Sequence, residues 1–257
     1  MSLAYDRRGQ GPPLMLVHGL GSYRGMWVPV LDRLAAEREV IAVDLPGFGD
    51  SPLLPGGARH DVSTLTEAVE RFIDGLGVGT PHVAGNSLGG GIALELARRG
   101  TVRSATALSP IGFWTPAEAR YAAASLRGSR ALARALRPLT PRLMRSTPLR
   151  TAFLGQIYAR PWRLDPDAAL ATVEAFRRAP GFDVTLPNTF RYYFWGVPRS
   201  PVTVAWGTRD RLLLPVQAER AREALPEARH VALQGCGHVP PSDDPDQVAE
   251  VLLAGSR

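Results

Sequence analysis

The stretch His82-Val83-Ala84-Gly85-Asn86-Ser87-Leu88-Gly89-Gly90-Gly91 decides the fold. Val83-Ala84 is the core of a short apolar run that predicts a buried strand, and the apolar spacing that starts at Leu88 predicts a helix directly after it. The Gly-x-Ser-x-Gly pattern between them predicts a sharp turn with Ser87 exposed at its apex, where glycines leave room for the backbone. A phosphate-binding glycine loop is the alternative, but the chain contains no Lys to complete one.

The rest of the chain alternates between short apolar runs and helical patterns up to about residue 109, and the alternation resumes near residue 201. This βαβ rhythm predicts an α/β fold with a mostly parallel sheet and helices on both faces. The predicted strands are Leu14–Val17, Val40–Val43, the run at Val83-Ala84, Ala105–Leu108, Val202–Ala205 and His230–Leu233. The predicted helices are Leu65–Leu76, Leu88–Arg99, Val216–Leu225 and Pro245–Leu253, with a capped start near Ser63 for the first.

Residues 113–199 break this rhythm, because they are rich in Ala, Arg and Leu and repeatedly interrupted by Pro. We interpret them as several short helices that form a cap inserted into the core. The predicted domain organisation is therefore a core of residues 1–112 and 200–257 and a helical cap of residues 113–199.

The composition excludes several classes of protein. With 45% hydrophobic and 21% charged residues, the 257-residue chain resembles an ordinary globular protein rather than a disordered one. A single cysteine, Cys236, supports neither a disulfide framework nor a cysteine-rich metal site, and we expect it to be a small buried residue. The chain shows no secretory signal pattern and no apolar run of about 18 residues, so we expect a cytoplasmic protein.

The positive charge does not indicate a nucleic-acid partner. The formal charge is +6, and every one of the 30 basic residues is Arg, which points to compositional bias. The excess lies in residues 113–200, where 14 arginines face five acidic residues. Arg127, Arg130, Arg134 and Arg137 have helical spacing and predict a solvated helix face. A funnel for anionic substrates is the sharper alternative, and contact with an acidic membrane surface is the less favoured one.

A serine hydroxyl needs a general base, and that base needs a carboxylate partner. His238 lies in a loop after the last predicted strand and is the predicted base. His18, His60, His82 and His230 lie in less suitable places, and His18 is expected to brace its own loop. Asp210 follows the strand Val202–Ala205 and is the predicted carboxylate. Asp44 is expected to hold its own turn, and Asp243 and Asp244 are expected to cap or brace the histidine loop.

Acyl transfer also needs donors for the negative charge that develops on the carbonyl oxygen. The backbone amide of Leu88 is one candidate, because it directly follows Ser87 and begins a helix. The amide of Leu20 is the other, since Gly19 and Gly21 allow the loop after the first predicted strand to turn that amide inward.

Five motifs together resemble the α/β-hydrolase fold superfamily, in its single-domain branch with a helical cap. They are His18-Gly19-Leu20-Gly21, Asp44-Leu45-Pro46-Gly47-Phe48-Gly49-Asp50-Ser51, Gly85-Asn86-Ser87-Leu88-Gly89-Gly90, Trp206-Gly207-Thr208-Arg209-Asp210 and Gly237-His238-Val239-Pro240. The resemblance spans about Gly11 to Leu253. It implies about eight strands, the chain order Ser87, Asp210, His238 for the catalytic triad, and neither a metal nor an organic cofactor.

The resemblance favours a serine hydrolase that cleaves a small-molecule carboxylic ester, as carboxylesterases do. Haloalkane dehalogenases and epoxide hydrolases of the superfamily carry Asp where this chain has Ser87. Carbon-carbon bond hydrolases that cleave carboxylate-bearing vinylogous diketones share the Gly-Asn-Ser elbow and remain the alternative, as does a non-catalytic ligand-binding protein. We expect an apolar small-molecule substrate, with an anionic group as an option. The candidate pocket residues are Trp27, Trp114, Tyr158 and Trp195.

Overall fold

The computed structural model describes residues 3–257, and over those residues the chain forms one seven-stranded sheet. Its strand order is β1-β3-β2-β4-β5-β6-β7. The strands are β1 (Tyr5–Arg8), β2 (Pro13–Val17), β3 (Glu39–Val43), β4 (His82–Asn86), β5 (Ser104–Leu108), β6 (Val202–Gly207) and β7 (Arg229–Leu233). Strands β2 to β7 pair in parallel, and β1 pairs antiparallel with β3 at the edge. This arrangement confirms the predicted α/β fold with a mostly parallel sheet.

The six predicted strands all occur, and β1 is the strand that the sequence did not indicate. Its residues, Tyr-Asp-Arg-Arg, are all exposed because β1 lies at the edge of the sheet. An exposed polar edge strand has no apolar run or alternation to identify it. The sheet has seven strands over the described residues, compared with the eight or so that the resemblance implied.

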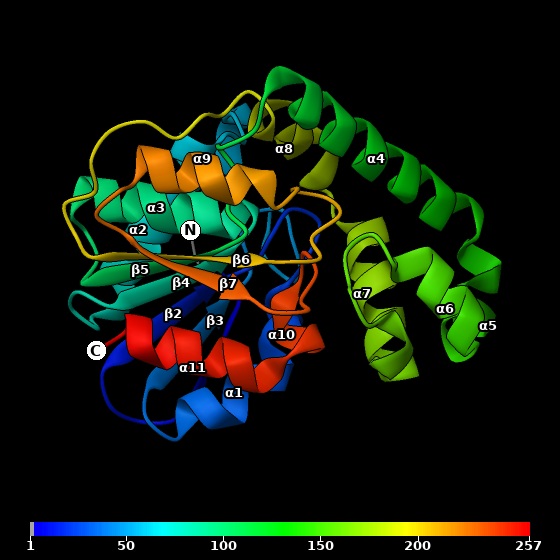
Figure 1. The fold of residues 1–257 in the computed structure, drawn as a ribbon, viewed down its shortest axis with the longest axis horizontal. Helices are drawn as coiled ribbons and strands as arrows, with labels where there is room; N and C mark the ends of the chain where they lie inside the picture. Colours follow the sequence, from blue (N-terminus) through cyan, green and yellow to red (C-terminus); the bar gives the residue numbers. More distant parts are fainter. Residues whose placement is uncertain (1–2) are drawn as a thin grey trace.

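Helices cover both faces of the sheet, as predicted (Figure 1). One face carries α2 (Val62–Leu76), α3 (Leu88–Arg99) and α9 (Val216–Ala224), and the other carries α1 (Val28–Ala35) and α11 (Pro245–Gly255). The short α10 (Pro240–Asp243) precedes α11, and four 3-10 turns occur at η1 (Arg24–Trp27), η2 (Pro55–Gly57), η3 (Arg137–Leu139) and η4 (Pro161–Arg163). Two large clusters of buried apolar side chains, one on each face, hold these layers together.

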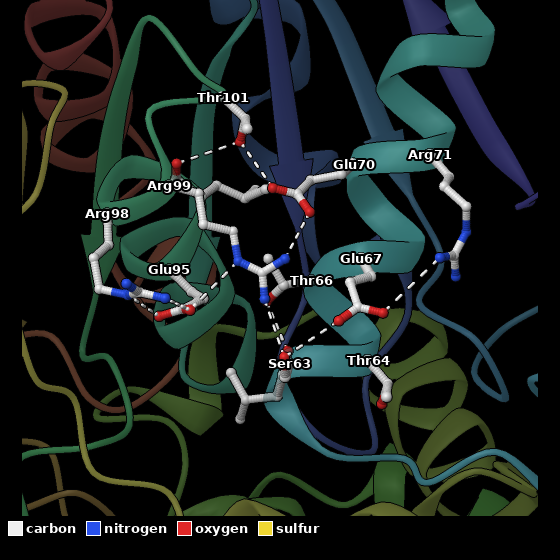
Figure 2. A network of polar contacts seen from close by, with 12 residues as sticks. Ser63, Thr64, Thr66, Glu67, Glu70, Arg71, Glu95, Arg98, Arg99 and Thr101 are labelled. Atoms are coloured by element: carbon white, nitrogen blue, oxygen red, sulfur yellow. Dashed lines mark hydrogen bonds and ion pairs between the residues drawn. The ribbon is translucent and has the colours of Figure 1, made fainter.

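A network of polar contacts joins α2 to α3 (Figure 2). Arg99 of α3 donates to Glu70 at 2.7 Å and to Ser63 at 3.1 Å, and both partners lie on α2. Thr101, just after α3, donates to Glu70 at 3.2 Å. Ser63 therefore contributes to this network. The N-cap residue of α2 is Asp61 instead, and its carboxylate accepts from the Thr64 amide at 3.0 Å. The network fixes the C-terminal end of α3, the helix that begins directly after Ser87.

The helical cap lies between β5 and β6 in the chain. It consists of α4 (Pro116–Ala135), α5 (Thr140–Arg145), α6 (Thr147–Leu154), α7 (Pro166–Arg178) and α8 (Phe182–Thr189). Helices α4 to α7 project to one side of the sheet, next to the loops that leave the carboxyl ends of its strands (Figure 1). The cap therefore stands over the edge of the sheet where the predicted site residues emerge.

The predicted arginine face, which lies on α4 and at the start of η3, is divided between two environments. Arg127, Arg134 and Arg137 are exposed, as a solvated face requires. Arg130 is buried, donates to the carbonyl oxygens of Phe176 and Ala179 at 2.7 Å, and stacks over a phenyl ring. The solvated interpretation was wrong for Arg130, because this guanidinium donates to carbonyl groups at the end of α7, where the helix leaves its last carbonyls without amide partners of its own.

Candidate active site

Ser87 lies at the junction of β4 and α3. Its backbone has φ 58° and ψ −113°, a conformation that residues other than glycine rarely adopt. A Cβ atom at Gly85 would clash with the carbonyl group of Gly89, and one at Gly89 would clash with the carbonyl of Val17. The two glycines are therefore required by close backbone contacts, as the sequence predicted. In this strained turn, Ser87 lines a cavity together with residues of the cap.

Asp210 and His238 are brought together from loops that follow β6 and β7. Their Oδ2 and Nδ1 atoms lie 2.8 Å apart, and both side chains are buried. Asp210 is held by the amides of Leu212 and Leu213, which both donate to Oδ1 at 2.9 Å. Because an ionised carboxylate only accepts hydrogen bonds, the proton of the neutral imidazole lies on Nδ1. The Nε2 atom of His238 is then free to accept a proton.

The loop that carries His238 is fastened to the cap by Asp243. This buried carboxylate accepts from the amides of Gly237, Ala159 and Arg160 at 2.8 to 2.9 Å. In addition, the amide of Val239 donates to the carbonyl of Ile157 at 3.0 Å. The residues on both sides of His238 are thus tied to cap residues 157–160. The brace that the sequence suggested for Asp243 joins two separate parts of the chain.

Asn86 joins the Ser87 turn to the same loop. Its side-chain amide donates to the carbonyl oxygens of His238 at 2.9 Å and Leu108 at 3.1 Å. The position of the histidine loop is therefore set from two sides, by β4 and by the cap. Asn86 was identifiable in the sequence only as part of a motif, and its contact with His238 was not predictable because that partner lies 152 residues away.

His18 and Asp44 have the supporting roles predicted for them. The buried His18 has Nδ1 2.7 Å from the Gly19 carbonyl, and its Nε2 accepts from the Leu45 amide at 2.9 Å. Burial lowers the pKa of His18, which suits a neutral ring with one donor and one acceptor. Asp44 accepts from the Asp50 amide at 3.0 Å and pairs with the guanidinium of Arg24.

The loop predicted to supply an oxyanion donor lies directly beside Ser87. A Cβ atom at Gly19 would be 3.1 Å from the Cβ of Ser87, a tighter contact than Cβ atoms usually make, so glycine favours this close approach. Leu20 follows and lines the same cavity as Ser87. Leu88 is the first residue of α3, where an amide has no acceptor within its own helix. Both predicted amides are thus in the immediate neighbourhood of the Ser87 hydroxyl.

A cavity of about 110 Å³ separates Ser87 and His238 from the cap. Its walls are mainly apolar, and Leu126, Phe153, Val173 and Phe176 of the cap contribute to them. Tyr158 also lines the cavity, as predicted, and burial raises the pKa of its phenol to about 12. Over the described residues, His238 is the single ionisable lining group other than this phenol.

Three of the predicted pocket residues lie elsewhere. Trp27 is fully buried in the apolar cluster beneath the sheet, on the side of α1 and α11. Trp114 is buried against Phe190, with the ring centres 4.8 Å apart. Trp195 is 72% exposed, and the guanidinium of Arg98 lies over its ring. These predictions were wrong because an aromatic residue near a motif packs equally well in a core, in a second cluster or at the surface.

The cavity is instead lined by residues whose role the sequence did not indicate. Besides the four apolar residues named above, they include Ser22, Ser129, Leu154, Gln156, Ile157, Thr172, Leu212 and Val239. Most belong to the cap, whose helices show no motif. Cys236, by contrast, is buried as expected, and burial raises the pKa of its thiol to about 12, which leaves it protonated at neutral pH.

A serine at a strand-to-helix elbow, on a mostly parallel sheet with an inserted helical cap, defines the α/β-hydrolase architecture. The sequence profile of the alpha/beta hydrolase family matches residues 14–251, and the chain belongs to that family. Within residues 3–257, none of the helices combines the length and apolar character needed to span a bilayer.

Relatives with different named activities are similar to this chain in sequence. The dihydrolipoyllysine-residue acetyltransferase component of the acetoin cleaving system of Pseudomonas putida is 30% identical over 259 residues, which cover 96% of this chain and 64% of that protein. The chain thus spans less than two thirds of that relative. Epoxide hydrolase EphH of Mycobacterium tuberculosis is 32% identical over 204 residues, covering 75% of this chain and 93% of the relative.

A solved structure described as a membrane phospholipase A has 29% sequence identity and a TM-score of 0.75, and the alignment covers 99% of this chain and 83% of that one. The comparisons therefore support hydrolase chemistry, and the choice of substrate depends on the site itself.

Proposed function

We propose that the protein is a serine hydrolase that cleaves a small-molecule carboxylic ester through an acyl-enzyme intermediate. The observation that carries this proposal is the 2.8 Å contact between His238 Nδ1 and Asp210 Oδ2, beside a cavity that both His238 and Ser87 line. This arrangement leaves Nε2 of a neutral imidazole as the base for a hydroxyl that faces the same cavity.

In the first step, Ser87 Oγ attacks the ester carbonyl carbon while His238 Nε2 accepts the hydroxyl proton. The tetrahedral oxyanion accepts hydrogen bonds from the amides of Leu20 and Leu88. The carbon-oxygen bond to the alcohol then breaks, and His238 returns the proton to the leaving oxygen. In the second step, His238 takes a proton from a water molecule, whose oxygen attacks the acyl carbon. The bond from that carbon to Ser87 Oγ then breaks, and His238 gives the proton to Oγ, which releases the acid and restores the Ser87 hydroxyl. Asp210 stabilises the imidazolium in both steps.

The mycobacterial relative is named an epoxide hydrolase, but the elbow of this chain favours ester chemistry. Ser87 is a neutral hydroxyl that requires a base to become a nucleophile, and we assign this role to His238, which lines the same cavity and contacts Asp210. A carbon-carbon bond hydrolase that binds a substrate carboxylate would need a cation on the cavity wall. Over residues 3–257 none of the arginines lines the cavity, so the site favours the ester.

Labelling with a fluorophosphonate, combined with hydrolysis of short-chain chromogenic esters, tests the proposal. We expect covalent labelling at Ser87 and ester turnover in the wild type. The Ser87→Ala variant should remain folded, resist labelling and lose several orders of magnitude in kcat. Full activity in that variant would refute the assignment of the nucleophile. Tight ligand binding without labelling or turnover would instead identify a binding protein on the hydrolase scaffold.

A further inference from the structure

The cavity wall that the cap contributes is mainly apolar and contains four polar side chains, Ser129, Gln156, Tyr158 and Thr172. Gln156, in the loop after α6, lines the cavity together with Ser129 of α4. Its amide nitrogen donates to Ser125 on α4, and Ser129 Oγ lies 3.5 Å from its amide oxygen. Ser125 and Ser129 are one helical turn apart, so both hydroxyls face the same amide. The Gln156 side chain is therefore held in place by α4 and keeps unused hydrogen-bonding capacity toward the cavity.

The apolar surroundings make the hydrogen bonding of Gln156 and Ser129 important for the choice of substrate. Leu126, Phe153 and Phe176 line the wall around it. A purely apolar substrate that filled the cavity would remove water from Gln156 and Ser129 without replacing the lost hydrogen bonds, which is unfavourable. A substrate with a hydroxyl or carbonyl group at that point would replace them. A carboxylate would find no cation on the wall within the described residues, so its burial would be uncompensated.

The size of the cavity limits the group that it can hold. An engineered apolar cavity of about 150 Å³ binds benzene, which has six heavy atoms, so by proportion about four heavy atoms of an acyl chain, counted beyond the ester carbonyl, fit in the cavity of about 110 Å³ observed here. The acyl group is the part of an ester that stays attached to Ser87 Oγ, and Ser87 lines this cavity. The acyl group is therefore the part of the substrate that the cap wall would contact during both steps.

We propose that the cap selects esters of short, uncharged acyl groups that carry a neutral hydrogen-bonding substituent, with Gln156 and Ser129 as the residues that recognise it. This inference rests on the proposed ester hydrolysis and specifies its substrate class. Gln156 is a specificity-determining residue in this assignment, and Ser125 positions its amide.

The test compares the hydrolysis of methyl 3-hydroxybutanoate with that of methyl butanoate. The acid released from each ester is measured by pH-stat titration. We expect kcat/KM for the wild type to be about tenfold higher for the hydroxylated ester, the gain that corresponds to one satisfied hydrogen bond. In Gln156→Met, which keeps the volume and removes the amide, this ratio should fall close to one, mainly through loss on the hydroxylated ester. Monomethyl malonate, whose chain beyond the ester carbonyl has as many heavy atoms as that of 3-hydroxybutanoate, should react with the wild type about a hundredfold more slowly than methyl butanoate, because its carboxylate is buried without a partner.

Leu126→Met is the matched control, since it alters a neighbouring part of the same wall without removing a polar group. The substrate ratio should stay within about twofold of the wild-type value in this variant. A wild-type ratio near one, or a ratio that is unchanged in Gln156→Met, would overturn the inference. If Ser87 is still labelled by fluorophosphonate and methyl butanoate is still hydrolysed, the proposed function survives that result. The loss of labelling and of all hydrolysis in the wild type would overturn both.

Discussion

Replacing Asp243 tests how strongly the cap is fastened to the loop of the proposed base. In Asp243→Ala, the amides of Gly237, Ala159 and Arg160 lose their acceptor. Each buried amide that is left unpaired costs about 1 to 3 kcal/mol, so the three together cost about 3 to 9 kcal/mol. Domains are stable by only about 5 to 15 kcal/mol. Water that enters the opened loop relieves part of this cost, and we therefore expect a loss near the lower limit.

A loss of about 3 kcal/mol corresponds to a decrease in Tm of about 6 to 12 °C for a chain of this size. Asp244→Ala is the matched control, because the neighbouring carboxylate accepts from the Gln247 amide at the start of α11. Losing that helix cap costs about 1 kcal/mol, and the decrease in Tm should be about 2 to 4 °C. Equal values of Tm for the two variants, measured by circular dichroism, would refute the proposed brace.

The rate of fluorophosphonate labelling separates this brace from a purely structural contact. If Asp243 positions the loop of His238, then Asp243→Ala should label Ser87 more slowly than Asp244→Ala at a temperature where both variants are folded. Asp243→Asn, which keeps one carboxamide oxygen, should give intermediate values of Tm and labelling rate. Labelling rates that match in all three variants would show that the brace contributes to stability alone.

Three further predictions follow from the buried polar groups. Asp210→Asn should lower kcat by about 10⁴-fold, as in a serine protease triad, because an amide facing Nδ1 of His238 forces the ring into the wrong tautomer; a decrease under tenfold in an ester assay would contradict this role. Burial lowers the pKa of His18, so below about pH 6.5 the unfolded chain binds a proton that the native chain does not, and stability falls as the pH falls. When urea unfolding is measured between pH 5.5 and 7.5, the free energy of unfolding of His18→Gln should depend less steeply on pH than that of the wild type. An unchanged slope would refute the assignment of this pH dependence to His18. The Cys236 thiol, whose pKa burial raises to about 12, should not react with a disulfide reagent at pH 8 until the protein is denatured; rapid reaction of the native protein would contradict its burial.

Strands β2 to β7 and the Ser87 elbow were predictable because each is encoded by neighbouring residues. A buried parallel strand needs a short apolar run, and the elbow needs glycine at two fixed positions. The contact between Asp210 and His238 was predictable because their loops follow strands whose carboxyl ends meet at one edge of the sheet. The edge strand β1 was missed because its residues are polar and exposed, so no local pattern distinguishes them from a loop.

The pocket was less predictable because an apolar or aromatic residue carries no information about what it faces. Trp27 and Trp195 have similar sequence surroundings, each with one Gly and a Val-Pro pair close by, yet one is fully buried and the other is 72% exposed. Arg130 illustrates the same point for charge. It belongs to a helical row of arginines in the sequence, and only the end of α7 packed against it shows that it is a buried structural residue.

Cap residues 156–160 link substrate recognition to the proposed base. On one side of this segment, Gln156 and Ile157 line the cavity. On the other, the Ile157 carbonyl and the amides of Ala159 and Arg160 are bonded to the loop and short helix that follow β7. A substitution that displaces the segment must therefore change both KM and kcat. Leu126 lines the wall from α4, and its backbone makes no bond to the histidine loop among the backbone hydrogen bonds of residues 3–257, so a change of this side chain should alter the choice of substrate while leaving proton transfer intact.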